Sequence, residues 1–160
     1  MLTLTLSTPG LLPGGNFEIP IWSQPMMHYP IATALTASVF GLVYFVLTMR
    51  VGLARRESGV TLGDGGNAAL QRQVRVHANF AEFVPICLIL LGLIESLGAD
   101  MLLVMSVALV FLAARILHAV GLSRDSGATF GRIMGAFGTI FVLAGSSIWL
   151  GMMALDHFMA

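Results

Sequence analysis

Long apolar stretches separated by short polar segments dominate the chain. The first, residues 31–49, carries no charge and ends before Arg50. As an α-helix, a stretch of this length covers about 28 Å, close to the roughly 30 Å hydrocarbon thickness of a bilayer. The last, residues 133–155, follows Arg132 and is also long enough. Each of these two stretches therefore predicts a membrane-spanning helix.

The two middle stretches are too short to span a membrane unless each includes a charged side chain. Only 12 residues lie between Glu82 and Glu95, and only 14 lie between Asp100 and Arg115. These lengths correspond to about 18 and 21 Å of helix, which is less than a bilayer requires. The second helix must therefore include Glu82 and the third must include Arg115, so the sequence predicts a carboxylate and a guanidinium inside the membrane.

These stretches predict an all-α, integral membrane protein whose four transmembrane helices form a bundle. We expect the helices over residues 31–50, 68–97, 101–122 and 130–155. Together they make one membrane domain, residues 30–156. Residues 1–29 contain prolines and glycines that disfavour a helix, and they lack the positively charged start of a signal peptide. We expect them to form an irregular external segment.

Composition agrees with this pattern. The 160 residues are 57% hydrophobic and 10% charged, with a mean hydropathy of +0.89 and no net charge. Soluble domains carry about 25% charged residues, so the composition excludes an ordinary soluble domain. A neutral chain without a basic run also excludes nucleic-acid binding. The single cysteine, Cys87, excludes an intrachain disulfide and a multi-cysteine metal site.

The cationic side chains, all arginines, are distributed unequally between the two sides of the membrane. With four antiparallel helices, one side carries Arg50, Arg55, Arg56, Arg72, Arg75, Arg124 and Arg132. The other side holds both termini and no arginine or lysine. By the positive-inside rule, the arginine-rich side faces the cytoplasm and both termini lie on the non-cytoplasmic side.

In each of the two middle helices, polar side chains lie on one face of the helix, and they lie at similar depth in the membrane. Arg75, Asn79 and Glu82 are spaced i, i+4 and i+7, which places them within roughly 60° of one another around the helix. Arg115 and His118 share a face of the third helix by the same spacing. Glu82 and Arg115 lie at similar depth, and an unpaired charge there costs several kcal/mol. We therefore expect these two side chains to pair.

This polar cluster has two interpretations. In the first, Glu82, Arg115 and Asn79 are a structural contact that holds helices together. In the second they belong to a ligand site, and the excess of arginines over acids favours an anionic ligand, carboxylates above all. His77 and His118 could also bind haem as axial ligands. Because His77 lies off the shared face, we expect no metal or haem site.

Three motifs resemble the MAPEG family (membrane-associated proteins in eicosanoid and glutathione metabolism). Residues 75–85 (RVHANFAEFVP) look like its second-helix signature, with Arg, His, Asn, Glu and Pro at the family's offsets. Residues 115–118 (RILH) are similar to its third-helix motif, and Arg132 to the arginine that opens its fourth helix. The resemblance covers about residues 31–155, and residues 62–66 and 93–95 are similar to bacterial members in particular, which implies a bacterial inner membrane.

The resemblance implies a homotrimer that binds glutathione as cosubstrate between neighbouring subunits, near the cytoplasmic face. The implied binding residues are Arg50, Arg75, Asn79, Glu82, Arg115 and His118. Arg132 would be the catalytic residue, because it would lie near the glutathione sulfur and stabilise the thiolate. The implied reaction is attack of this thiolate on a lipophilic electrophile or peroxide from the lipid bilayer, as in a transferase or peroxidase.

Three positions differ from the well-studied enzymes of the family. Leu122 and Ile133 stand where such enzymes place a tyrosine and a serine, and Ala78 stands where some have an arginine. Each difference removes a hydrogen-bonding group from the implied site. They favour an alternative, in which the chain is a non-catalytic membrane protein that binds lipid or serves as an accessory subunit of a larger membrane complex.

Overall fold

The computed structural model describes residues 28–124 and 129–159. They form four α-helices: α1 (Ile31–Ser58), α2 (Ala68–Ser96), α3 (Met101–Arg124) and α4 (Phe130–Met159). All four are long and apolar enough to span a membrane. The prediction of an all-α bundle of membrane-spanning helices is therefore confirmed. The prediction of an irregular segment at residues 1–29 falls almost entirely outside the described residues.

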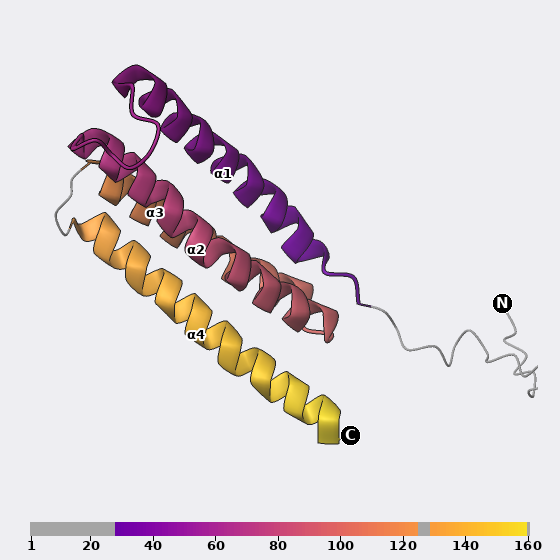
Figure 1. The fold of residues 1–160 in the computed structure, drawn as a ribbon. Helices are drawn as coiled ribbons and strands as arrows, with labels where there is room; N and C mark the ends of the chain where they lie inside the picture. Colours follow the sequence, from indigo (N-terminus) through magenta and orange to yellow (C-terminus); the bar gives the residue numbers. More distant parts are fainter. Residues whose placement is uncertain (1–27, 125–128, 160) are drawn as a thin grey trace, which may run out of the picture.

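The helices form a bundle in which α2 and α3 are central and α1 and α4 lie on opposite sides (Figure 1). Within the described residues, α1 and α4 each contact both central helices but not each other. Successive helices run antiparallel. One end of the bundle, called here the arginine end, holds the 59–67 loop and the start of α4. The other, the turn end, holds the 97–100 connection and the start of α1.

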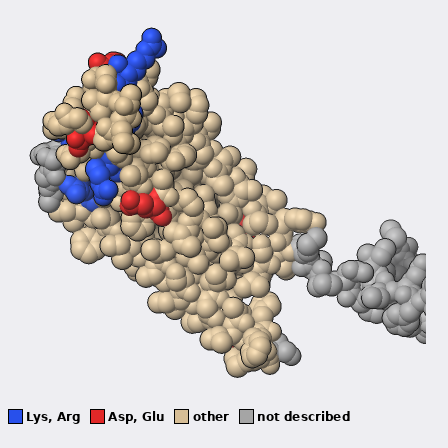
Figure 2. Space-filling model, viewed as in Figure 1, with Lys and Arg blue, Asp and Glu red and all other residues tan. Residues whose placement is uncertain are grey.

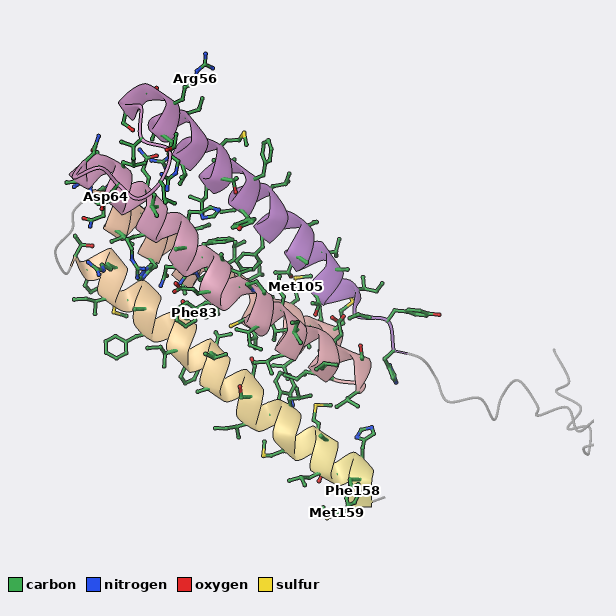
Figure 3. The ribbon with its side chains drawn as sticks, in the orientation of Figure 1. Arg56, Asp64, Phe83, Met105, Phe158 and Met159 are labelled. Atoms are coloured by element: carbon green, nitrogen blue, oxygen red, sulfur yellow. The ribbon has the colours of Figure 1, made fainter. Side chains whose placement is uncertain are left out.

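Charged side chains gather at the arginine end, and the rest of the face shown in Figure 2 is almost entirely uncharged. Arg56 points away from the bundle at the end of α1 (Figure 3). Helix α1 continues two turns beyond Arg50, where the hydrophobic stretch predicted its end. A charged residue ends an apolar stretch but not a helix, and α1 stops only at Gly59, whose φ of 66° is left-handed.

The first turn of α1 is capped by a side chain from α2. Pro30, at the N-cap position, makes no side-chain cap. Instead, the Glu95 carboxylate accepts hydrogen bonds from the backbone N–H groups of Ala32 (2.8 Å) and Thr33 (2.9 Å) and from Thr33 Oγ1 (2.8 Å). The positive end of the helix dipole further stabilises this buried carboxylate. Glu95, which in the sequence is only the charged residue after an apolar stretch, therefore joins α1 to α2.

Helices α3 and α4 approach closely at the arginine end because glycine occupies the contact points. A Cβ at Gly135 would lie 2.5 Å from the backbone N of His118, and one at Gly121 would lie 2.5 Å from the backbone N of Arg132. No side chain fits at these distances, so both positions require glycine. Small residues commonly permit such contacts between membrane helices. The contact places the start of α4 directly against α3.

We predict that Glu95→Ala lowers the free energy of unfolding by about 1–3 kcal/mol, since it removes a charge-assisted cap from α1. Thermal unfolding of the purified protein in detergent measures this loss. Glu57→Ala is the matched control, because Glu57 is an exposed acid at the opposite end of the same helix. Equal effects of the two substitutions would contradict the capping role of Glu95.

Candidate functional site

A polar hollow of about 230 Å³ opens at the arginine end, where α2, α3 and α4 meet. It is lined by Gln71, Arg72, Arg75, Asn79, His118, Leu122 and Arg132. Three of these residues are arginines and none is acidic, so the hollow attracts anions. The structure thus brings together four of the predicted site residues: Arg75, Asn79, His118 and Arg132.

The polar residues of α2 lie on two different sides of the helix. Arg75 and Asn79, one turn apart, face the hollow. His77 lies on the other side, as its position in the helix predicted. Its ring stacks on Tyr44 of α1, with 4.8 Å between the ring centroids, and its Nε2 lies 3.1 Å from Thr48 Oγ1. His77 therefore contributes to the contact with α1 and not to the hollow.

Arg115 lies inside the bundle behind Asn79, with only 1% of its surface exposed. Its Nη2 donates a hydrogen bond to Asn79 Oδ1 (2.8 Å), and its Nη1 donates to Thr139 Oγ1 (3.3 Å). Its guanidinium carbon is 5.8 Å from the ring centroids of both Phe80 and Phe83, within cation–π range. Arg115 therefore links α3 to α2 and α4 at a single point.

The predicted ion pair between Glu82 and Arg115 is wrong. Within the described residues, the Arg115 guanidinium bonds to an amide and a hydroxyl oxygen and to no carboxylate. Glu82 is instead exposed on the surface of α2. Asn79, one turn earlier, reaches α3 first and offers a neutral acceptor. Among the described residues, no carboxylate is therefore bonded to the positive charge behind the hollow.

His118 connects α3 to the first turn of α4. Its Nδ1 lies 3.1 Å from the carbonyl oxygen of Arg132, and because a carbonyl only accepts, Nδ1 is the protonated nitrogen. This bond and the close glycine contacts place Arg132 at the wall of the hollow. Leu122, one turn after His118, is buried and makes the same wall partly apolar.

Arg50 does not line the polar hollow. It lines a different hollow of about 350 Å³, between α1 and α3, together with Arg124 and the predicted site residue Arg115. A ligand in the polar hollow would therefore meet Arg50 only from a neighbouring copy of the chain.

Comparison with known proteins identifies the family. The MAPEG family model matches residues 33–152, from α1 to α4. The chain belongs to the MAPEG family. It is similar to the inner membrane protein YecN of Escherichia coli K12, with 33% identity over 91 residues, which cover 57% of this chain and 70% of that protein. The protein of the same name from E. coli O6:H1 strain CFT073 matches with the same figures. With its four apolar helices, this MAPEG chain is an integral membrane protein.

Two residues of the hollow and one partner of Arg115 were not predicted from the sequence. Arg72 lies three residues before Arg75 on α2, and that spacing of nearly one turn could have indicated it. Gln71 carries no comparable signal. Thr139 reaches Arg115 only through the register of α4 against α3, which no local pattern in this MAPEG sequence specifies.

We predict that Asn79→Ala lowers the free energy of unfolding by about 1.5–3 kcal/mol, because it removes an acceptor from a buried guanidinium. When Arg115→Met is added to the Asn79→Ala variant, it should recover part of this loss, since the buried charge itself is then absent. Denaturation of the two single variants and the double variant completes a double-mutant cycle, which measures the coupling energy between Asn79 and Arg115.

Gln71→Ala is the control for this cycle, because Gln71 also lines the hollow but is exposed. It should change stability by less than about 0.5 kcal/mol. Additive effects of Asn79→Ala and Arg115→Met would show that the hydrogen bond between them is not energetically important.

Proposed function

We propose that this MAPEG protein binds glutathione in the polar hollow and uses its thiolate as a transferase or peroxidase on a lipophilic substrate. The observation that carries the proposal is the convergence of Arg75, Asn79 and Arg132 on one hollow, in front of the buried charge of Arg115. Guanidinium groups bind carboxylates through paired hydrogen bonds, and the amide of Asn79 suits the peptide groups of glutathione.

Arg132 is the proposed catalytic residue, because it lies in the first turn of α4. Both its guanidinium and the N-terminus of the helix present positive charge to the hollow. Such an environment increases the fraction of a bound thiol that is ionised at neutral pH, and the thiolate is the nucleophile. The sulfur would attack an electrophilic carbon, so that a C–S bond forms and the leaving group departs with its electron pair.

With a lipid hydroperoxide, the same thiolate would attack the terminal oxygen. The O–O bond breaks, the sulfur is oxidised to a sulfenic acid, and the lipid leaves as an alcohol after it takes up a proton. A second glutathione then converts the sulfenic acid to the disulfide and releases water. In both reactions the protein binds the peptide and stabilises the thiolate, and the bilayer supplies the apolar substrate.

A neighbouring copy of the chain would complete the site. The hollow, at about 230 Å³, is smaller than the roughly 300–1,000 Å³ typical of ligand pockets. An exposed stripe on α2 consists of Arg75, Glu82, Ile86, Ile89 and Leu93. Its spacing of three, four or seven residues is that of a helix-packing seam. We propose that this stripe forms a homotrimer interface, through which Glu82 and a neighbour's Arg50 reach the ligand.

The proposed orientation follows from the arginine end seen in Figure 2. By the positive-inside rule this end faces the cytoplasm, and both termini lie on the other side of the membrane. Glutathione would then enter the hollow from the cytoplasm.

A non-catalytic role is the second candidate, and Leu122 is the observation that favours it. This buried side chain lines the hollow at the position where the resemblance places a tyrosine in well-studied enzymes. A chain of this kind would keep the fold and the Arg115 contacts while binding lipid or acting as an accessory subunit of a larger membrane complex.

Titration of the purified protein with glutathione, followed by the ultraviolet absorbance of the thiolate, distinguishes the two candidates. We expect a saturable thiolate signal. Arg132→Ala should lower the thiolate fraction by about tenfold, which corresponds to roughly 1.4 kcal/mol of lost stabilisation. Arg75→Ala should weaken binding by at least about tenfold, since it removes a charge-assisted contact.

Arg56→Ala is the control for both variants, because Arg56 lies at the same end of the molecule but points away from the bundle (Figure 3). If glutathione neither binds nor gives a thiolate signal, the catalytic proposal fails and the non-catalytic role stands. Full thiolate formation in Arg132→Ala would refute the role of Arg132 alone.

Native mass spectrometry tests the trimer. We expect the unmodified protein to be trimeric and Ile89→Trp to dissociate it, because a bulky ring would separate the α2 stripes. Leu109→Trp on α3 is the matched control, since Ile89 and Leu109 are each 57% exposed. Dissociation by Leu109→Trp but not by Ile89→Trp would place the interface on α3 instead.

A further inference from the structure

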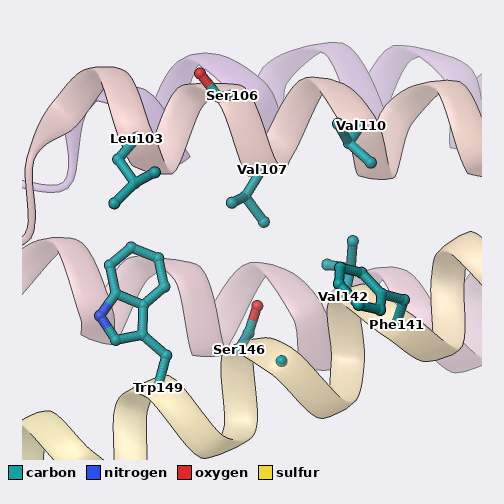
Figure 4. Close-up of a pocket in the computed structure, with 9 residues that line it drawn as sticks. Leu103, Ser106, Val107, Val110, Phe141, Val142, Ser146 and Trp149 are labelled. Carbon is teal, nitrogen blue, oxygen red and sulfur yellow. The ribbon is translucent and has the colours of Figure 1, made fainter.

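An apolar cavity of about 410 Å³ lies between α3 and α4 toward the turn end (Figure 4). Its main walls are Leu103, Val107 and Val110 from α3 and Phe141, Ser146 and Trp149 from α4. The volume lies within the range of roughly 300–1,000 Å³ that is typical of small-molecule sites. We call it the α3–α4 cavity.

The cavity contains one polar group of particular interest, the hydroxyl of Ser146. Ser146 is 3% exposed, and its Oγ has no hydrogen-bond partner within the described chain. In Figure 4 this oxygen points from α4 into the space between the helices. Its neighbour Ser147 donates to the carbonyl oxygen of Leu143, four residues earlier, as serines in helices usually do. Ser146 instead directs its hydroxyl away from its own helix.

The surroundings of Ser146 leave room for a ligand beside this hydroxyl. Trp149 and Phe141 lie on either side of Ser146 in Figure 4. Gly145 also lines the cavity, and a Cβ at that position would meet nothing within 4 Å. Hydrocarbon around the helices supplies no water, so in this side-chain conformation a ligand with an acceptor atom would satisfy the Ser146 hydroxyl.

The α3–α4 cavity is separate from the polar hollow. Ser146 follows Arg132 by 14 residues on α4, which is about 21 Å along the helix. A carbonyl group beside Ser146 therefore lies far from a sulfur beside Arg132. Helix α2 contributes no residue to the lining of the cavity, so an interface along the α2 stripe does not depend on it.

We infer that the α3–α4 cavity binds a membrane-soluble molecule with an apolar body and one carbonyl oxygen, which accepts a hydrogen bond from Ser146 Oγ. The apolar walls fit the body, and the hydroxyl proton fits the carbonyl. A ligand hydroxyl fits less well, because its own proton would need an acceptor that these walls do not offer. A plain acyl tail would leave Ser146 without a partner.

Fluorescence quenching of Trp149 tests this inference in the full chain, purified in detergent. Trp22→Phe leaves Trp149 as the sole tryptophan, because the sequence contains 2. The probes are a bromine-labelled long-chain methyl ketone and a bromoalkane of equal length that lacks the oxygen. We expect saturable quenching by both and an affinity for the ketone that is about tenfold higher, which is the contribution of one hydrogen bond.

Ser146→Ala should abolish the preference for the ketone and leave alkane binding unchanged. Ser147→Ala, the control at the adjacent position, should keep the preference. Because Ser146→Ala removes an unpartnered hydroxyl, its melting temperature should not fall, so a lost preference would not reflect unfolding. Its glutathione signal should also be unchanged, which separates this inference from the proposed function.

Several outcomes would overturn the inference. Equal affinities for the ketone and the alkane, or a preference that survives in Ser146→Ala, would show that the hydroxyl binds no carbonyl. Quenching that rises without saturation would show partition into detergent and no site. Complete protection of Trp149 from both probes, together with cross-linking between copies through α4, would show that a second copy fills the cavity.

Discussion

The Arg115 guanidinium is the contact on which the arrangement of three helices depends. It donates to Asn79 on α2 and to Thr139 on α4, between the rings of two phenylalanines. In a membrane no water replaces these partners, so displacement of either helix would leave a buried charge with fewer hydrogen bonds. The polar hollow forms beside this contact, since Asn79 both binds Arg115 and lines the hollow.

The fourth helix, α1, is fixed by different interactions. Glu95 holds its first turn at the turn end, and Phe40 packs 5.8 Å from Phe80 and 5.2 Å from Phe111 between ring centroids. Nearer the arginine end, Tyr44 stacks on His77. A charge-assisted cap and a series of aromatic contacts thus attach α1 along its length, while α1 and α4 have no contact within the described chain.

Helix α4 carries the decisive residue of both proposed sites, and the two sites suit different media. Arg132 lies at the polar arginine end, where an anionic, water-soluble ligand can enter. Ser146 lies in the apolar part of the same helix, where a ligand would arrive from the lipid. The glycines of α4 serve both: Gly135 allows close contact with α3, and Gly145 leaves space in the α3–α4 cavity.

The sequence by itself determined the membrane spans and most of the hollow. The thickness of the bilayer required helices that include Glu82 and Arg115, and helical spacing placed Arg75 and Asn79 together. Only the tertiary structure decided that Arg115 bonds to Asn79 and not to Glu82, and that Glu95 caps α1. The positions of the membrane-spanning stretches, and the residues that share one face of a helix, follow from a one-dimensional pattern. The partner of a side chain depends on the rotation and register of one helix against another, which close packing fixes.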